Sequence, residues 1–335
     1  MNQYHGIVVN RDSDDGEYDV NPLQLMSLTL QSNCLVGNFR KTFKYFFVTV
    51  GKHLRVLNLS RNELNYKKGL PKELSHCKVL TTLLLENTGG KGPMPDEAGI
   101  LDLPSLQVLS LAGNQFEGSP EYIFQISQQL RVVNLSNNHF DGVIESAWLA
   151  PLKNTIETID FSYNRFGGIF FTKEVCQLFG NTIKHLKLSG NNFVGSLPRE
   201  IKQLKLLEVL HIDKNNFTGM IPYEFFKLTN MRRLWMEKNT LMGDIAEFKR
   251  MKNLRTLVIG ENNFGEEVPD VLAKLKYLRV LRMNDNRFVG VFPMLLLVKM
   301  KCLREFDITG NKYMNGNSVK RAMEYCVEQN IQSKR

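Results

Sequence analysis

The side chains of this 335-residue chain with the clearest potential for joint chemistry are two histidines and a carboxylate. His185, His211 and Asp213 lie in neighbouring copies of a repeated segment, so adjacent strands could bring them together as a metal or acid–base cluster. The chain contains no H-E-x-x-H, G-x-S-x-G, Walker or kinase signature. A flat, open sheet would leave such groups in water, whereas catalysis usually needs a dry cleft. We therefore expect no enzymatic activity, no metal and no cofactor.

A second set of side chains has the composition of a binding surface. Trp and Arg are the residue types most enriched at interaction hot spots, and an exposed Trp is costly without a partner. Trp235 is the centre of this predicted surface, with Arg233, His211 and Arg282 around it. An alternative is that Trp235 packs sideways on Arg233 and Lys187 and binds nothing. The full set of predicted ligand-binding residues is His185, Lys187, His211, Asp213, Arg233, Trp235, Glu237, Arg282 and Asp307.

A repeated segment must position these side chains. Leu106 to Phe116 reads L-x-x-L-x-L-x-x-N-x-F, and about twelve copies follow one another every 23–29 residues. Such a period is the signature of a stacked solenoid. The Asn position is occupied by Asn33, Asn62, Thr88, Asn114, Asn138, Asn164, Asn191, Asn215, Asn239, Asn262, Asn286 and Asn311.

The pattern within each copy predicts a short strand followed by a tight loop. Alternation sends the leucines of L-x-L to the core and the residue between them to the open face of a parallel sheet. The Asn should turn inward to satisfy buried backbone groups, which Thr88 can do less well. The aromatic two residues later should form a second apolar column, with Tyr313 in the last copy. The open-face row reads Thr29, Asn58, Leu84, Ser110, Asn134, Asp160, Lys187, His211, Trp235, Val258, Arg282 and Asp307.

The second half of each copy resembles the plant-type leucine-rich-repeat family, whose consensus continues G-x-I-P. Clear matches are Gly195-Ser-Leu-Pro198, Gly219-Met-Ile-Pro222 and Gly290-Val-Phe-Pro293. The resemblance implies an α/β repeat fold, a curved solenoid with its parallel β-sheet on the concave face and a C-terminal capping helix. We expect a partial N-terminal cap over residues 1–22, leucine-rich repeats over residues 23–314, and a capping helix and tail over residues 315–335.

The two ends carry further expectations. Residues 317–329 show an apolar stripe at helical spacing, and Ser318 is a plausible N-cap. Tyr4 to Val9 is similar to the end of the family's N-terminal cap, with Val9 where the family has a cysteine. The five cysteines are odd in number and contain no C-x-x-C pair, and no leader or membrane span is evident. These features favour an intracellular protein, whereas a longer N-terminus and a glycan on Asn216 would favour an extracellular one.

Charge is distributed unevenly along the chain. Residues 1–180 hold 16 Lys and Arg against 18 Asp and Glu, whereas residues 181–335 hold 27 against 16. A basic half suits an acidic partner, a nucleic acid or an anionic membrane surface, unless it only keeps the repeats soluble. Nucleic acid is not expected, because no aromatic stacking row accompanies the basic residues. These precede the variable strand positions and are Arg55, Arg131, Lys184, Arg232, Arg255, Arg279 and Arg304.

The sequence thus predicts a non-catalytic recognition module that binds a protein or peptide through the concave face of repeats 7–12, with an acidic partner as one option. Two alternatives stay open. One is a receptor-like ectodomain, or an inhibitor of a hydrolase, that senses a peptide or polysaccharide. The other is a structural subunit of a larger assembly.

Overall fold

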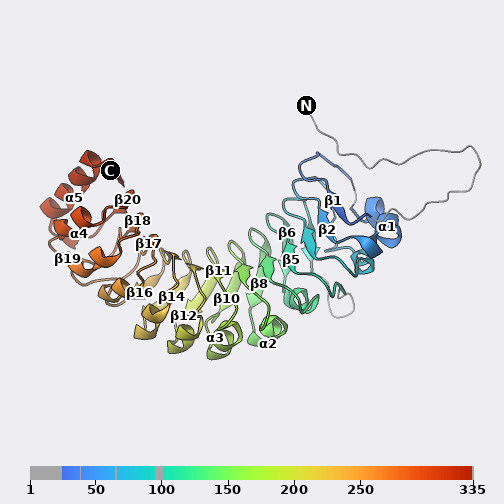
Figure 1. Ribbon diagram of the computed structural model, residues 1–335, viewed down its shortest axis with the longest axis horizontal. Coiled ribbons are helices and arrows are strands. Elements are labelled where there is room, and N and C mark those ends of the chain that lie inside the picture. The colour runs from blue at the N-terminus through green and yellow to red at the C-terminus, as the bar shows by residue number, and fades with distance from the viewer. Residues whose placement is uncertain (1–24, 38, 65, 95–100, 334–335) are drawn as a thin grey trace, which may run out of the picture.

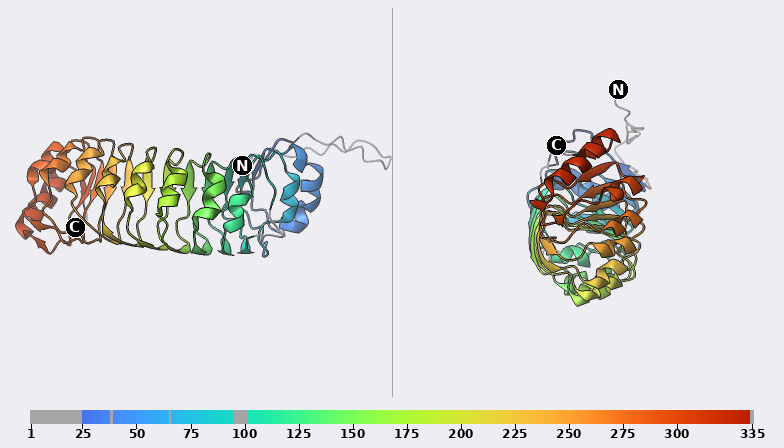
Figure 2. Two further views of the ribbon diagram at one scale, coloured as in Figure 1. Left: turned by 90° about the horizontal axis from the view of Figure 1, so that it is seen from below. Right: turned by 90° about the vertical axis from the view of Figure 1, so that its left-hand side faces the viewer.

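The computed structural model describes residues 25–37, 39–64, 66–94 and 101–333. Over these residues the chain winds into an open, curved solenoid of stacked coils (Figure 1). Strands line the inner side of the curve and short helices line the outer side. The left-hand view in Figure 2, from below, shows the coils following one another in a single row. Each coil therefore contacts mainly its neighbours, as in repeat proteins generally.

The concave face is one 13-stranded parallel sheet in which sequence order equals spatial order. Twelve of its strands are the predicted L-x-L segments, which confirms the twelve repeats. Their bounds are β1 (Ser27–Thr29), β2 (Val56–Asn58), β3 (Thr82–Leu84), β5 (Val108–Ser110), β7 (Val132–Asn134), β9 (Thr158–Asp160), β11 (His185–Lys187), β13 (Val209–His211), β15 (Arg233–Trp235), β17 (Thr256–Val258), β18 (Val280–Arg282), β20 (Glu305–Asp307) and the additional β22 (Gln332–Ser333).

A second parallel sheet of seven strands runs along the solenoid and was not predicted from the sequence. It is formed in repeats 3–9 by the half-repeat that follows the Asn or Thr position, because this half is extended there and pairs with the same half of the next repeat. Its strands are β4 (Lys91–Pro93), β6 (Gln115–Gly118), β8 (His139–Val143), β10 (Arg165–Gly168), β12 (Asn192–Gly195), β14 (Asn216–Met220) and β16 (Thr240–Met242), and a separate pair follows, β19 (Val289–Gly290) with β21 (Tyr313–Met314).

The outer side carries short helical segments that return the chain to the next strand. The α-helices are α1 (Phe39–Thr49), α2 (Ser146–Leu149), α3 (Lys173–Phe179), α4 (Met294–Lys299) and α5 (Gly316–Glu328). The 3₁₀ segments are η1 (Gly51–His53), η2 (Lys72–His76), η4 (Glu121–Gln125), η5 (Ala150–Leu152), η6 (Arg199–Gln203), η7 (Tyr223–Lys227), η8 (Ala246–Arg250) and η9 (Asp270–Lys274). Single turns suffice here because each coil has few residues in which to cross the convex side.

The core is one apolar column running through the coils. The strand leucines are fully buried, and the predicted aromatic column is confirmed: Phe140 and Phe166 stack with ring centroids 6.2 Å apart. Phe166 continues the stack onto Phe193 at 6.3 Å. The expectation for the last copy is wrong, because Tyr313 is exposed and Met314 takes the buried place in β21.

The inward Asn residues close the loops as predicted. In repeat 7 the Asn191 amide donates to the Phe161 carbonyl at 2.9 Å and the Leu188 carbonyl at 3.1 Å, and its Oδ1 accepts from the Phe166 N–H at 3.1 Å. Each such bond satisfies a buried backbone group of the loop or of the preceding repeat. These loops also hold a left-handed residue just before the Asn, for example Lys214 with φ of 54°.

Thr88 was expected to give a weaker loop, yet its hydroxyl is fully engaged. It donates to the Leu85 carbonyl at 2.9 Å and lies 2.8 Å from the Tyr66 hydroxyl. Tyr66 is buried and packs towards Phe116 through the space above Gly90, where a Cβ would come within 2.8 Å of either ring. A tyrosine from the preceding repeat thus fills the space of the missing aromatic, and its hydroxyl contacts the hydroxyl that stands in the place of the amide.

The C-terminal end differs in detail from the expectation. The capping helix is present as α5, but its N-cap is Asn315, whose Oδ1 accepts from the Ser318 N–H at 3.0 Å. After the helix, the tail returns to the sheet as β22, where the Gln332 N–H donates to the Arg304 carbonyl at 2.8 Å. The predicted N-terminal cap over residues 1–22 lies outside the described residues.

Candidate functional site

The open-face row of the concave sheet is in the register that the repeat pattern predicts. Lys187 pairs with His211 and His211 with Trp235, on β11, β13 and β15. Val258 and Arg282 continue the row on β17 and β18, ahead of Asp307 on β20. Because the strands are parallel and in register, the side chains of this row lie side by side, about 4.8 Å apart.

Trp235 and His211 form a stacked aromatic pair at the centre of the predicted surface. Their ring centroids are 4.8 Å apart and their planes are 12° from parallel. The Trp235 side chain remains 39% exposed, with its neighbour on the next strand, Val258, buried. The proposed sideways packing on Arg233 and Lys187 is thus replaced by stacking on His211, which supports the indole and leaves part of it facing solvent.

His211 is held as a neutral ring. Burial is the main cause that lowers its pKa to about 4, and the cations Lys187 and Arg233 lower it further, whereas Asp160 raises it. Its Nε2 atom is buried and has no hydrogen-bond partner within the described residues. A neutral imidazole stacks on an indole without the cost of desolvating a charge.

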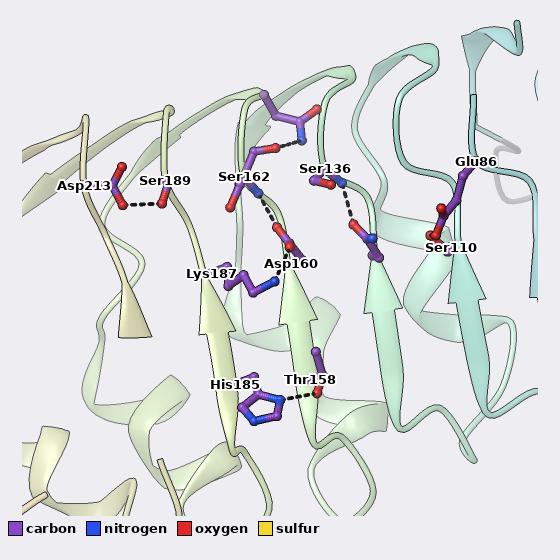
Figure 3. Close-up of polar contacts among 12 residues, drawn as sticks. Glu86, Ser110, Ser136, Thr158, Asp160, Ser162, His185, Lys187, Ser189 and Asp213 are labelled. Carbon is purple, nitrogen blue, oxygen red and sulfur yellow. Dashed lines mark hydrogen bonds and ion pairs between the residues drawn. The ribbon is translucent and has the colours of Figure 1, made fainter. Parts of the chain in front are cut away.

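The other histidine is also placed by a neighbouring strand. His185 Nδ1 lies 3.2 Å from the Thr158 hydroxyl on β9 (Figure 3), and burial lowers its pKa. It shares a sheet with His211 but occupies a different row, two residues before the open-face position. Within the described residues, no group of three His, Cys, Asp or Glu side chains could hold a metal ion.

The predicted cations differ in whether they are already neutralised. Lys187 Nζ is 3.1 Å from Asp160 Oδ2 (Figure 3), and Arg282 pairs with Glu305 on the next strand. Arg233, which shares β15 with Trp235, is exposed and forms no ion pair within the described part of the chain. Arg233 is therefore the cation of this surface that is free to meet a carboxylate.

The predicted acidic residues are mostly buried, which corrects their expected exposure. Asp213 is 2% exposed and accepts from the Ser189 hydroxyl at 2.5 Å (Figure 3), and burial raises its pKa. Asp307 is also 2% exposed and accepts from the Thr309 N–H at 3.0 Å and hydroxyl at 2.7 Å. The Asp307 carboxylate thus turns back onto the loop after its own strand, whereas the Asp213 carboxylate joins its loop to that of the preceding repeat. Glu237 is half-buried, with its pKa raised by burial and by Asp213.

Sequence reasoning missed the partners of the cations. Asp160 was placed in the open-face row without a role, yet Asp160 and Glu305 neutralise Lys187 and Arg282. The repeat register could have identified both partners. In a parallel sheet, a side chain lies beside the residue at the same repeat position on the next strand and close to the residues two positions before and after it.

The chain matches known leucine-rich-repeat sequences over most of its length. The family "Leucine-rich repeat region" matches residues 159–332, and "Leucine Rich Repeat" matches residues 53–77, 105–126 and 129–149. Receptor-like protein 41 of Arabidopsis thaliana is 28% identical over 182 residues, which is 53% of this chain and 19% of that protein. Receptor-like protein 43 of Arabidopsis thaliana is 34% identical over 200 residues, covering 55% of this chain and 26% of that protein. The chain therefore spans about a fifth to a quarter of the length of these relatives.

Solved structures share the whole architecture. The plant peptide hormone receptor RGFR1 in complex with RGF2 has a TM-score of 0.75 and 27% identity, covering 91% of this chain and 46% of that one. A TDR receptor has a TM-score of 0.73 and 27% identity, covering 92% of this chain and 55% of that one. Both support the curved solenoid with its parallel concave sheet.

The comparisons overturn the predicted intracellular location. The relatives are plant receptor-like proteins and receptors, whose leucine-rich repeats are extracellular or at the cell surface. Three of the five cysteines are buried, and burial raises the pKa of the Cys77 and Cys176 thiols to about 12 and that of Cys326 to about 11. Because these three thiols form little thiolate, their unpaired state does not indicate a reducing compartment.

None of the helices in the described ranges is long and apolar enough to cross a membrane.

Proposed function

The chain belongs to the leucine-rich-repeat family, and on that premise we propose that it is a non-catalytic recognition module that binds a protein or peptide through the concave face of repeats 7–12. The observation that carries the proposal is the half-exposed Trp235 indole, stacked on a neutral His211 in the middle of a flat sheet. A rigid aromatic platform of this kind is an efficient anchor, because it offers a large contact area that loses little entropy on binding.

The charges around the platform favour an extended segment with an acidic residue. Arg233 stands on the same strand as Trp235, two residues earlier and on the same face, and has no ion pair in the described part of the chain. A guanidinium without a partner is suited to bidentate contact with a carboxylate. The surface therefore fits a ligand that has an apolar side chain to pack on Trp235 and a neighbouring carboxylate to pair with Arg233. One structurally similar protein is a peptide hormone receptor in complex with RGF2, and this likeness supports a peptide as the class of partner.

The proposal is tested by selecting binders from a random peptide display library on the intact protein. Selected peptides are then measured by titration against the wild type, Trp235→Ala and the control Thr29→Ala, which changes an exposed residue of the same sheet in repeat 1. Trp235→Ala should weaken binding about 30-fold, because a hot-spot aromatic contributes ~2 kcal/mol or more. Thr29→Ala should leave affinity unchanged.

An enriched peptide set that binds Trp235→Ala as tightly as the wild type would contradict the site. A second readout is available because the chain has two tryptophans, Trp148 and Trp235. Trp148→Phe leaves Trp235 as the sole indole, so its fluorescence should change when a peptide covers it. Hydrolysis or chemical alteration of any selected peptide would contradict the non-catalytic part of the proposal.

A further inference from the structure

A second column of charged residues runs along the solenoid beside the concave sheet, at the residue three positions before the open-face row. We call it the strand-entry column. Consecutive members are joined through the backbone: the Arg279 N–H donates to the Arg255 carbonyl and the Arg304 N–H to the Arg279 carbonyl, both at 2.8 Å. From repeat 5 onwards the column reads Arg131, Glu157, Lys184, Glu208, Arg232, Arg255, Arg279 and Arg304.

In repeats 5–9 the column neutralises itself, because the charges alternate in sign. Glu157 contacts Arg131 at 3.0 Å on one side and Lys184 at 2.7 Å on the other. Glu208 lies 3.4 Å from Arg232 in the same way. The basic row that the sequence analysis singled out is therefore internally paired over this stretch.

In repeats 10–12 the alternation stops and the charge is uncompensated. Arg255, Arg279 and Arg304 are consecutive, all three are exposed, and none has an ion pair within the described residues. A lysine lies three residues before each of them in the same turn, and these lysines are also exposed and unpaired in the described ranges. They are Lys252, Lys276 and Lys301. Six positive charges thus line one flank over three coils, at the end that Figure 1 colours orange to red.

We propose that this basic flank is a binding site for a linear polyanion, specifically a carboxylated polysaccharide of the polyuronate type. Like charges held this close repel one another, and an anionic polymer that spans all three coils would relieve the repulsion at once. Guanidinium groups bind carboxylates in bidentate geometry. The site is separate from the concave platform around Trp235, so either can exist without the other.

An exposed aromatic ring among the cations favours a polysaccharide over an acidic peptide. The arginines recur once per coil, at the strand separation of about 4.8 Å, and a polyuronate carries one carboxylate on every ring. Tyr277, 61% exposed, lies between Lys276 and Arg279 and offers an aromatic face to a sugar ring. A nucleic acid would need a row of such aromatics for its bases.

The test uses the whole protein and a pair of probes with the same sugar backbone, de-esterified oligogalacturonide, which carries a carboxylate on each ring, and its fully methyl-esterified form, which is uncharged. Binding is measured by calorimetry or biolayer interferometry. The de-esterified form should bind and the esterified form should not, and added salt should weaken binding because the charges are exposed to solvent.

Variants then locate the site. Arg255→Gln, Arg279→Gln and Arg304→Gln together should weaken binding about tenfold or more, because three exposed ion pairs are lost at once. The matched control, Arg131→Gln with Lys184→Gln and Arg232→Gln, removes the same number of positive charges from the self-neutralised stretch and should change affinity by less than about twofold. Tyr277→Ala should weaken oligogalacturonide binding without changing binding of polyglutamate. Circular dichroism confirms that each variant is folded.

Equal binding of the two oligogalacturonides, or full affinity in the Arg255/Arg279/Arg304 variant, would overturn the site. Tighter binding of polyglutamate or of single-stranded DNA than of oligogalacturonide would overturn the polysaccharide assignment, as would an unchanged affinity in Tyr277→Ala. The Trp235→Ala variant should bind oligogalacturonide as tightly as the wild type does. The polysaccharide site can therefore be confirmed or overturned independently of the peptide experiment.

Discussion

The Trp235 platform depends on a side chain from the neighbouring strand. His211 is the row member next to Trp235, and its ring lies almost parallel to the indole at 4.8 Å. Because His211 is mostly enclosed, its protonation would place a charge beside Lys187 and Arg233 in a poorly solvated site. The neutral His211 ring therefore supports the Trp235 indole in its partly exposed position.

This coupling predicts a pH dependence of stability. The pKa of His211 is about 4 in the folded protein and about 6.5 when unperturbed. Between these values the unfolded chain binds more protons than the folded one, so the His211 contribution is complete above about pH 6.5 and declines as the pH falls towards 4. The total loss is roughly 3 kcal/mol at most.

Urea unfolding at several pH values, compared between the wild type and His211→Phe, isolates this contribution. His211→Phe keeps an aromatic ring for the stack and removes the titration, so its stability should depend less on pH between 6.5 and 4. The raised pKa values of Asp213 and Glu237 act in the opposite direction but are present in both proteins. Parallel pH curves for the two proteins would show that His211 is not the group responsible.

At the scale of the element, each loop after a concave strand depends on one inward Asn. The amide reaches three backbone groups, including a carbonyl of the preceding repeat, so it joins coils as well as closing the loop. Repeat 3 shows a reduced version of this arrangement, because the Thr88 hydroxyl donates to the Leu85 carbonyl of its own loop and contacts the Tyr66 hydroxyl. The bond that an Asn amide makes to a carbonyl of the preceding repeat has no counterpart among the side-chain hydrogen bonds of Thr88 and Tyr66.

We expect Asn191→Ala to lower the free energy of unfolding by about 2–3 kcal/mol, because it leaves buried backbone groups of Phe161, Leu188 and Phe166 without partners. Asn192→Ala is the matched control, since this neighbouring amide is exposed and should be nearly neutral. Chemical denaturation of both variants provides the measurement. A loss below about 0.5 kcal/mol for Asn191→Ala would mean that water replaces the amide.

At the scale of the whole molecule, the described chain is one stack whose C-terminal end is closed by the tail. The helix α5 buries Ala322 and Cys326 against the last coil, and β22 pairs with β20 as the final strand of the sheet. An unpaired strand edge is a template for association with other chains. A two-residue strand therefore covers a surface that the repeats alone would leave open.

Deleting residues 330–335 should expose the β20 edge while leaving the other coils intact, because each repeat is stabilised mainly by its neighbours. Hydrogen exchange should speed up at Glu305–Asp307 and stay unchanged in β11, which serves as the internal reference. Sedimentation should show concentration-dependent association of the truncated protein. A monomer with full protection at β20 would show that β22 contributes little to closing the sheet.

The repeat pattern alone determined the architecture, the register of the concave row and the inward positions of Leu, Asn and Phe. These follow from local rules, since strand alternation and a fixed period place each residue relative to the same position one coil away. The central place of Trp235 in this row was predicted on the same basis. Whether that surface binds a partner remains a prediction.

Only the tertiary structure decided which of these side chains are free. Asp307 shares its repeat position with the exposed Trp235, yet it turns into the loop after its strand and is buried. Asp213 is buried where it accepts a hydrogen bond from Ser189 of the preceding repeat. Lys187 and Arg282 are neutralised by Asp160 and Glu305 from adjacent strands, whereas Arg233 is unpaired in the described residues. Exposure, pairing and protonation depend on contacts between coils some 25 residues apart in sequence, and a pattern read within one repeat does not include them.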